Sequence, residues 1–155
     1  MAKSLATIEI SDSAIFKACV QNSNDAILLS DPRGIIFYVN PAWERLFDYT
    51  KAEVIGKTPR ILRSGHHPSS YYAEMWKDIL DPMKHFWKGE MVNVSKRGRE
   101  VPVLLTISYF KEIQKDTTGY MSIALDLTEK KKLEMQLQWQ DRLATIGLLA
   151  GGIAH

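Results

Sequence analysis

The chain has 155 residues, enough for one domain with its own hydrophobic core and a short appendage. Hydrophobic residues at 45% and charged residues at 25% exclude a disordered or collagen-like chain, and the net charge of +2 is too small to indicate binding to nucleic acid or to an anionic membrane. The only cysteine, Cys19, excludes an internal disulfide and a cysteine-based zinc cluster. We expect a cytoplasmic protein, because residues 144–154, the longest apolar stretch, are too few to span a bilayer and the first residues lack the apolar segment of a signal peptide.

The first forty residues predict a helix followed by a β-hairpin. Residues 11–21 carry apolar side chains at a spacing of three to four, which is typical of one face of a helix. The apolar run 25–30 and the β-branched and aromatic run 35–39 predict two strands, and the Asp-Pro-Arg-Gly sequence between them predicts a tight turn. The apolar positions of the helix are Ile15, Phe16, Cys19 and Val20.

The next segment predicts three elements rich in capping signals. Asn40 and Pro41 begin a helix, because Asn is a good N-cap and Pro costs no hydrogen bond at the first helical position. Residues 50–53 form a capping box that begins a second, shorter helix. We expect residues 60–68 to form a loop and a longer helix to begin at residue 69 or 70 and to end before Asp81-Pro82.

From residue 87 onwards the pattern has a period of two, which is typical of β-strands. Residues 87–94, 101–110 and 120–127 predict three strands, separated by turns at 96–98 and 114–119. The chain is therefore expected to be of the α+β class, with a five-stranded antiparallel sheet that has helices on one face.

Residues 129–142 contain no helix breaker and consist of strong helix formers, so they predict a long C-terminal helix. Its apolar positions continue for about three heptads as an imperfect coiled-coil seam. An exposed helix of this kind needs a partner for its apolar side, so we expect a homodimer. The seam positions are Leu133, Leu137, Ala144, Leu148 and Gly151.

The order of motifs resembles a PAS sensory domain. The motifs are Val39-Asn-Pro-Ala-Trp43, Ile55-Gly-Lys57, Trp87-Lys-Gly-Glu90, Lys96-Arg-Gly98, Gly119-Tyr120 and Asp126-Leu-Thr128. The resemblance implies the PAS fold, with an N-terminal helix or cap in residues 1–23, the PAS domain in 24–128 and a coiled-coil linker in 129–155. It also implies that Asp126 and Thr128, at the junction into a signalling helix, transmit the signal.

Residues 141–155 resemble the first helix of a histidine-kinase dimerisation and phosphotransfer domain. In that family the histidine at the position of His155 accepts phosphate. The resemblance implies that the parent protein is a protein-histidine kinase cut at this point, and that the fragment, without an ATP-binding domain, is not itself an enzyme. The implied partners are a second copy, the ATP-binding domain of the same parent chain and a response-regulator receiver domain, with no nucleic acid and no membrane span in this fragment.

A ligand pocket is expected between the sheet and the helices. The stretch 59–65, with Trp76 and Asn93, is closest to the flavin-binding redox-sensor branch of the family, where the matching Trp and Asn lie at the isoalloxazine ring. The resemblance therefore implies FAD or FMN; another ligand, or an aromatic core with a surface Asn and no ligand, remains open. Candidate lining residues are Trp43, Phe47, Ile61, Leu62, Tyr72, Trp76 and Ile79 from the helices and Asn93, Leu105, Ile107 and Ile123 from the sheet.

Other cofactor chemistry finds less support in the sequence. Haem needs an axial histidine, which haem-binding PAS domains generally carry on the longer helix, whereas His66, His67 and His85 all lie in predicted loops. The adjacent pair His66 and His67 does not make a metal site either, because a third ligand is missing. Cys19 lies outside the Asn-Cys-Arg context of flavin-adduct chemistry in the family and is expected to be structural. We therefore expect the sensory module of a two-component histidine kinase that detects a small ligand or a redox state. The alternative is a ligand-free PAS domain that acts as a dimerisation or interaction module.

Overall fold

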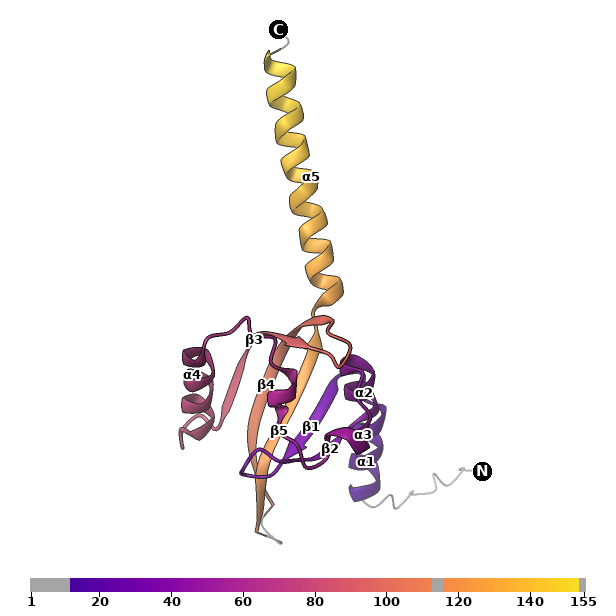
Figure 1. The fold of residues 1–155 in the computed structure, drawn as a ribbon, viewed down its shortest axis with the longest axis vertical. Helices are drawn as coiled ribbons and strands as arrows, with labels where there is room; N and C mark the ends of the chain where they lie inside the picture. The colour runs from indigo at the N-terminus through magenta and orange to yellow at the C-terminus, as the bar shows by residue number, and fades with distance from the viewer. Residues whose placement is uncertain (1–11, 113–115, 154–155) are drawn as a thin grey trace, which may run out of the picture.

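The computed structural model describes residues 12–112 and 116–153, which form one antiparallel sheet, a set of short helices and a long C-terminal helix (Figure 1). The strand order is β2-β1-β5-β4-β3, so the first and last strands are neighbours in the middle of the sheet. This arrangement confirms the predicted fold class. The strands are β1 (Ala26–Ser30), β2 (Ile36–Val39), β3 (Phe86–Val94), β4 (Glu100–Glu112) and β5 (Thr117–Asp126).

The short helices lie in two groups, one beside each edge of the sheet (Figure 1). α4 lies beside β3, whereas α2 packs against β1 and α3 lies beside β2 (Figure 1). Asn40 caps α2 as predicted, because its side-chain oxygen accepts a hydrogen bond from the backbone N–H of Trp43 at 2.9 Å. The capping box at Thr50 and Glu53 is also present. The helices are α1 (Asp12–Asn22), α2 (Pro41–Phe47), α3 (Lys51–Val54), the 3-10 helix η1 (Pro59–Leu62), α4 (Ser69–Leu80) and α5 (Thr128–Ile153).

Two predicted boundaries differ from the structure. The expected loop 60–68 begins with the single turn of η1, because Pro59 presets its backbone angle and Arg63 N–H bonds to the carbonyl of Arg60 at 3.1 Å. One turn is too short to leave a periodic signal in the sequence. The last two strands also extend further than predicted, since the ladder continues to the pair Glu112 and Thr117, beyond the apolar alternation.

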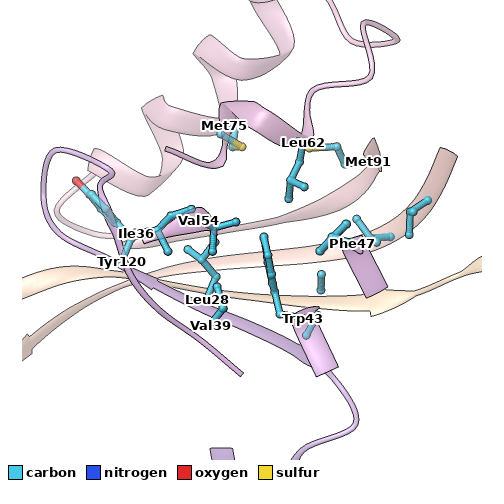
Figure 2. Packing of buried hydrophobic residues seen from close by; sticks show 14 of the residues in the cluster. Leu28, Ile36, Val39, Trp43, Phe47, Val54, Leu62, Met75, Met91 and Tyr120 are labelled. Carbon is cyan, nitrogen blue, oxygen red and sulfur yellow. The ribbon is translucent and has the colours of Figure 1, made fainter. Parts of the chain in front are cut away.

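The hydrophobic core lies between the inner face of the sheet and the helices (Figure 2). Trp43 and Phe47 from α2 are almost fully buried, and their ring centroids lie 5.1 Å apart. Val54 from α3 and Ile36 from β2 close one side of the core. Burial of these large side chains supplies the main driving force for folding and fixes the short helices over the sheet.

α5 extends away from the domain, and none of its residues is buried (Figure 1). It leaves several large apolar side chains in solvent, among them Leu133, Leu137, Trp139 and Leu148. Within the described residues, no helix combines the length and the apolar character needed to cross a membrane. α5 thus presents large apolar side chains to solvent along its length.

Candidate functional site

A cavity of about 380 Å³ lies between the helices and the inner face of the sheet. This volume lies within the range of pockets that hold small molecules. The sheet is hollowed there because β5 contributes the small side chains of Ser122 and Ala124, which face Leu28 and Leu105 of the neighbouring strands. Eight residues predicted from the sequence line it: Trp43, Phe47, Leu62, Tyr72, Trp76, Asn93, Leu105 and Ile107.

Three predicted residues lie outside the cavity wall. Ile123 lies between Ser122 and Ala124 on β5, and side chains alternate along a strand, so it belongs to the opposite face of the sheet. Ile61 belongs to the single turn of η1, whose neighbouring Leu62 enters the cavity, and packs partly buried against the core. Ile79 is buried in the core without lining the cavity.

The structure adds lining residues that the sequence analysis missed. On β3 the alternation from Asn93 leads to Met91, whereas on β5 the choice of Ile123 put the prediction on the wrong face and missed Tyr120, Ser122 and Ala124. The others come from β1, from α4, from the hairpin turn and from the segment around η1, which only the tertiary fold brings to the cavity. The additional residues are Leu28, Ser30, Arg33, Gly34, Thr58, Pro59, Arg60, Arg63, Met75, Met91, Tyr120, Ser122 and Ala124.

Asn93 is one of two buried polar residues among the described residues of this wall, the other being Ser30. Its residue is 5% exposed, so it is not a surface Asn, and in the part of the chain that the structure describes its side-chain amide makes no hydrogen bond. No buried side-chain nitrogen or oxygen among the described residues lacks a partner, so the Asn93 amide reaches the open space of the cavity, where a ligand or water can bond to it. Asn93 can therefore donate and accept one hydrogen bond each at the edge of a bound molecule.

Aromatic rings form the apolar part of the site. The ring of Trp76 on α4 meets the ring of Tyr120 on β5 edge to face, with 5.3 Å between centroids and an interplanar angle of 78°. Burial raises the pKa of the Tyr120 phenol, and the neighbouring Tyr109 adds to the effect. Tyr120 therefore stays neutral at physiological pH, and this wall suits a flat, apolar ligand.

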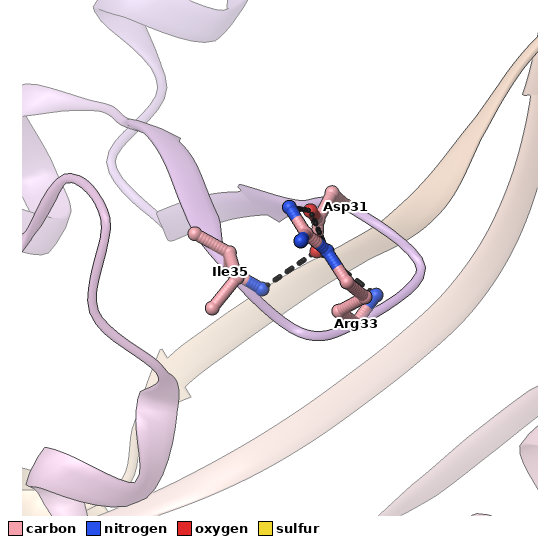
Figure 3. Close-up of polar contacts among 3 residues, drawn as sticks. All are labelled: Asp31, Arg33 and Ile35. Atoms are coloured by element: carbon pink, nitrogen blue, oxygen red, sulfur yellow. Dashed lines mark hydrogen bonds and ion pairs between the residues drawn. The ribbon is translucent and has the colours of Figure 1, made fainter.

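The mouth of the cavity carries three guanidinium groups, those of Arg33, Arg60 and Arg63. Arg33 is held by Asp31, whose carboxylate accepts hydrogen bonds from its Nε and Nη2 at 3.1 and 2.9 Å (Figure 3). The same carboxylate accepts from the backbone N–H of Ile35 at 2.9 Å, and this bond is the main reason that the pKa of Asp31 is lowered. Arginines at the rim suit a ligand with an anionic group.

The predicted transmission residues meet at the start of α5. The Asp126 carboxylate accepts hydrogen bonds from the backbone N–H and the hydroxyl of Thr128, at 2.9 and 2.6 Å. Lys131, one turn into α5, pairs with Glu90 on β3 at 2.7 Å. This hydrogen-bonded ion pair lowers the pKa of Glu90 and raises that of Lys131. The helix is thus tied to both β5 and β3, strands that line the cavity.

The residues considered for other chemistry lie away from the cavity. None of His66, His67 and His85 is a lining residue, and Cys19 is exposed on α1 rather than packed in the core. Over residues 12–112 and 116–153 no three side chains of His, Cys, Asp or Glu come together as metal ligands. His155, the predicted phosphoacceptor, lies outside the described residues.

The family model described as "PAS domain" matches residues 24–129. The chain is 30% identical over 124 residues to a nitrogen fixation regulatory protein of Klebsiella pneumoniae, an alignment that covers 80% of this chain and 25% of that protein. It is 25% identical over 138 residues to the signal transduction histidine-protein kinase AtoS of Escherichia coli, covering 88% and 22% respectively. The chain thus spans about a quarter of the length of these relatives.

The fold is also similar to a solved structure, the crystal structure of the PAS domain of a protein from Colwellia psychrerythraea. The two have a TM-score of 0.66 and 21% sequence identity, over 74% of this chain and 96% of that chain. This likeness concerns the arrangement of strands and helices and agrees with the sheet order described above.

Proposed function

Because this chain belongs to the PAS domain family, we propose that it is the signal-input module of a two-component sensor histidine kinase, detecting a small ligand or a redox state in its cavity. The observation that carries the proposal is the cavity between helices and sheet, with the side-chain amide of Asn93 in its wall. Relatives among sensor histidine kinases support the same role for the parent protein.

The ligand we propose is a flavin, FAD or FMN. Three features support it: the slot between Trp76 and the sheet suits a flat ring, the Asn93 amide suits a ring edge with both donors and acceptors, and the arginines at the mouth suit a phosphate. Haem is a weaker candidate, because none of the histidines that the structure describes lines the cavity.

The output we propose runs along α5. A change in the cavity would shift β3 and β5, and Asp126, Thr128 and Lys131 would pass the shift to α5. Two copies of α5, paired through their exposed apolar side chains, would then change register or rotation. This would alter access of the ATP-binding domain to His155, the proposed phosphoacceptor, which passes phosphate to a receiver domain in the cytoplasm.

The test is an absorption spectrum of the freshly purified protein, followed by denaturation and mass analysis of any released molecule. Flavin bands and a released FAD or FMN are expected, and Asn93→Ala should lower the amount of bound flavin. Ile123→Ala is the matched control, because Ile123 belongs to the outer face of the same sheet. A Soret band would overturn the flavin assignment.

The second candidate is a ligand-free PAS domain that serves as a dimerisation or interaction module. It is favoured by the apolar side chains that α5 and α1 leave in solvent, which include Leu133, Leu137 and Phe16. Both candidates predict a dimer, so the oligomeric state does not separate them. A colourless protein that releases no small molecule would favour this second function.

A further inference from the structure

The free edge of β3 is closed by side chains rather than by another strand. β3 ends the sheet, so some of its backbone groups point away from β4. The backbone N–H of Val92 donates to Nε2 of His67 at 2.9 Å, and the hydroxyl of Ser64 donates to the Val92 carbonyl at 2.5 Å. The hydroxyl of Tyr71 donates to the carbonyl of Glu90, also at 2.5 Å. The segment between η1 and α4 thus replaces a sixth strand.

These same contacts close the cavity on this side. Leu62 and Arg63, just before Ser64, both line the cavity, and Asn93, just after Val92, does so from the strand. Arg63 and Asn93 also form a single antiparallel β-bridge. If the segment leaves the edge of β3, the wall that separates the Asn93 amide from solvent is opened.

The bond between His67 and Val92 exists in only one protonation state. Nε2 of His67 accepts a hydrogen bond, so it carries a lone pair and the ring proton lies on Nδ1. A protonated imidazole places a proton on Nε2 as well, so that two donors face each other and the bond is lost. Histidine is the side chain that ordinarily changes charge between about pH 5 and 8.

We propose that His67 is a pH-sensitive latch on the ligand cavity. The neutral imidazole holds the edge of β3 and keeps the cavity closed; the protonated imidazole releases Val92 and opens the cavity beside Asn93. In this role His67 is a positioning residue, since it acts on the cavity through the backbone of β3 and does not line it.

Two aromatic rings pack against the imidazole of His67. The ring of Tyr71 stacks on the imidazole with 4.6 Å between centroids, and the ring of Tyr72 meets it edge on at 6.3 Å. No ion pair joins His67 to a carboxylate in the described part of the chain. The charged or titratable groups of the surrounding segments are Arg63 and His66, Glu90 on β3, which pairs with Lys131, and Glu100 on β4, which contacts His66.

The test is amide hydrogen exchange of the full chain, followed by NMR between pH 8 and 5. The readout is the protection factor of the backbone amides of Val92 and of residues 63–66. A protection factor compares each amide with the unstructured chain at the same pH, so it already corrects for the intrinsic effect of pH on exchange. We expect protection to fall about tenfold between pH 7.5 and 5.5, the change that loss of one partly buried hydrogen bond produces. The ring 15N shifts of His67 should report the Nδ1–H tautomer at the upper end of the range.

Two variants separate the latch from a merely structural role. In His67→Gln the side-chain oxygen can accept from Val92 but does not titrate, so protection should no longer depend on pH. His66→Gln removes the neighbouring, exposed histidine and should leave the pH response unchanged. Protection of Val92 that is constant with pH in the unmodified chain, or a pH response that persists in His67→Gln, would overturn the proposal.

Discussion

The side chain of Asn40 joins three segments of the fold with its full set of hydrogen bonds. Its amide oxygen accepts from the backbone N–H groups of Ile27 and Trp43, both at 2.9 Å. Its amide nitrogen donates to the carbonyls of Val20 and Asp25, at 3.0 and 2.9 Å. Because Asn40 is fully buried, α1, β1 and α2 are fixed to one another by a single polar group.

Asn40→Asp should therefore destabilise the fold severely. The new carboxylate keeps the two acceptor bonds but leaves two partly buried carbonyls without this donor and places a charge in the core. We expect the free energy of unfolding to fall by about 2–4 kcal/mol, measured by urea denaturation. Asn24→Asp changes an exposed Asn nearby and should have little effect; equal losses in the two variants would contradict this account.

Gly119 allows β5 to pass close to its neighbours. A Cβ atom at this position would collide with the backbone carbonyl oxygen of Ser30 and lie 2.9 Å from the ring of Phe110. Since the carbonyl belongs to the paired strand β1 and cannot move cheaply, Gly119→Ala should cost about 1–3 kcal/mol in thermal or urea unfolding.

Gly147 is the matched control for this substitution. It lies inside α5, where a Cβ would meet no other atom within 4 Å. Gly147→Ala should therefore raise helicity in circular dichroism without loss of stability, because Ala favours helix by about 0.5–1 kcal/mol over Gly. A Gly119→Ala variant that is as stable as the unmodified chain would show that β5 can shift away from β1.

At the scale of whole elements, α5 depends on the strand that precedes it. The Asp126 carboxylate satisfies the N–H of Thr128, one of the amides that a helix leaves free in its first turn. Leu127 is buried and its N–H bonds to the carbonyl of Pro102 on β4 at 2.8 Å. The start of α5 therefore moves with the sheet.

Asp126→Ala should loosen this joint without unfolding the domain. Loss of the cap is expected to weaken the first turn of α5 by about 1 kcal/mol, visible as faster hydrogen exchange of the Thr128 and Lys131 amides. Under the function proposed above, the same variant should uncouple signal from kinase output in the parent protein. Asp126→Asn keeps an acceptor and is the control; an unchanged response to signal in Asp126→Ala would argue against transmission through this residue.

The elements that could be predicted from the sequence are those with local signals. The caps at Asn40 and Thr50 and the turn before Gly34 act within a few residues, so the helices and the hairpin were placed correctly. The period of two identified the three later strands. Their ends were missed because backbone pairing continues to Glu112 and Thr117 regardless of which side chains follow.

The cavity could be predicted only where a residue type already indicated burial. Trp43, Phe47 and Trp76 are large and apolar, and the resemblance to the family indicated Asn93. Ser122 was missed because its contribution is the space that it leaves free. Arg33 was missed because the hairpin turn reaches the mouth only through the pairing of β1 with β5.

At the scale of the whole molecule, surface carboxylates tie the short helices to the sheet. Glu53 on α3 pairs with Lys96, in the turn between β3 and β4, and caps its own helix at Thr50. The hydrogen bond from Lys96 is the main reason that the pKa of Glu53 falls from 4.5 to about 2. The pKa of Asp31 is lowered as well, by the backbone N–H of Ile35 above all.

These shifts predict a loss of stability in acid. A carboxylate whose pKa is lower in the folded state stabilises that state above its unfolded pKa, and the contribution disappears as pH falls through the folded value. For Glu53 the window runs from about pH 4.5 to about pH 2. The melting temperature should therefore fall less steeply below pH 4.5 in Glu53→Gln than in the unmodified chain.

The control for this prediction is Glu74→Gln on α4. Glu74 is exposed and has no ion pair within the described ranges, so its replacement should leave the acid profile unchanged. If the melting temperatures of Glu53→Gln and of the unmodified chain fall equally steeply below about pH 4.5, the Glu53 contact does not persist in solution.

The strand order has a consequence for how the chain is made. β1 lies between β2 and β5, and its residues pair with residues 120–124, almost a hundred positions later. During synthesis the hairpin of β1 and β2 must therefore wait, with its inner edge unpaired, until nearly the whole domain has left the ribosome. The meander β3-β4-β5 can assemble first from local contacts. The last strand completes the sheet just before α5 emerges, so α5 gains its base on β5 only once the sheet is complete.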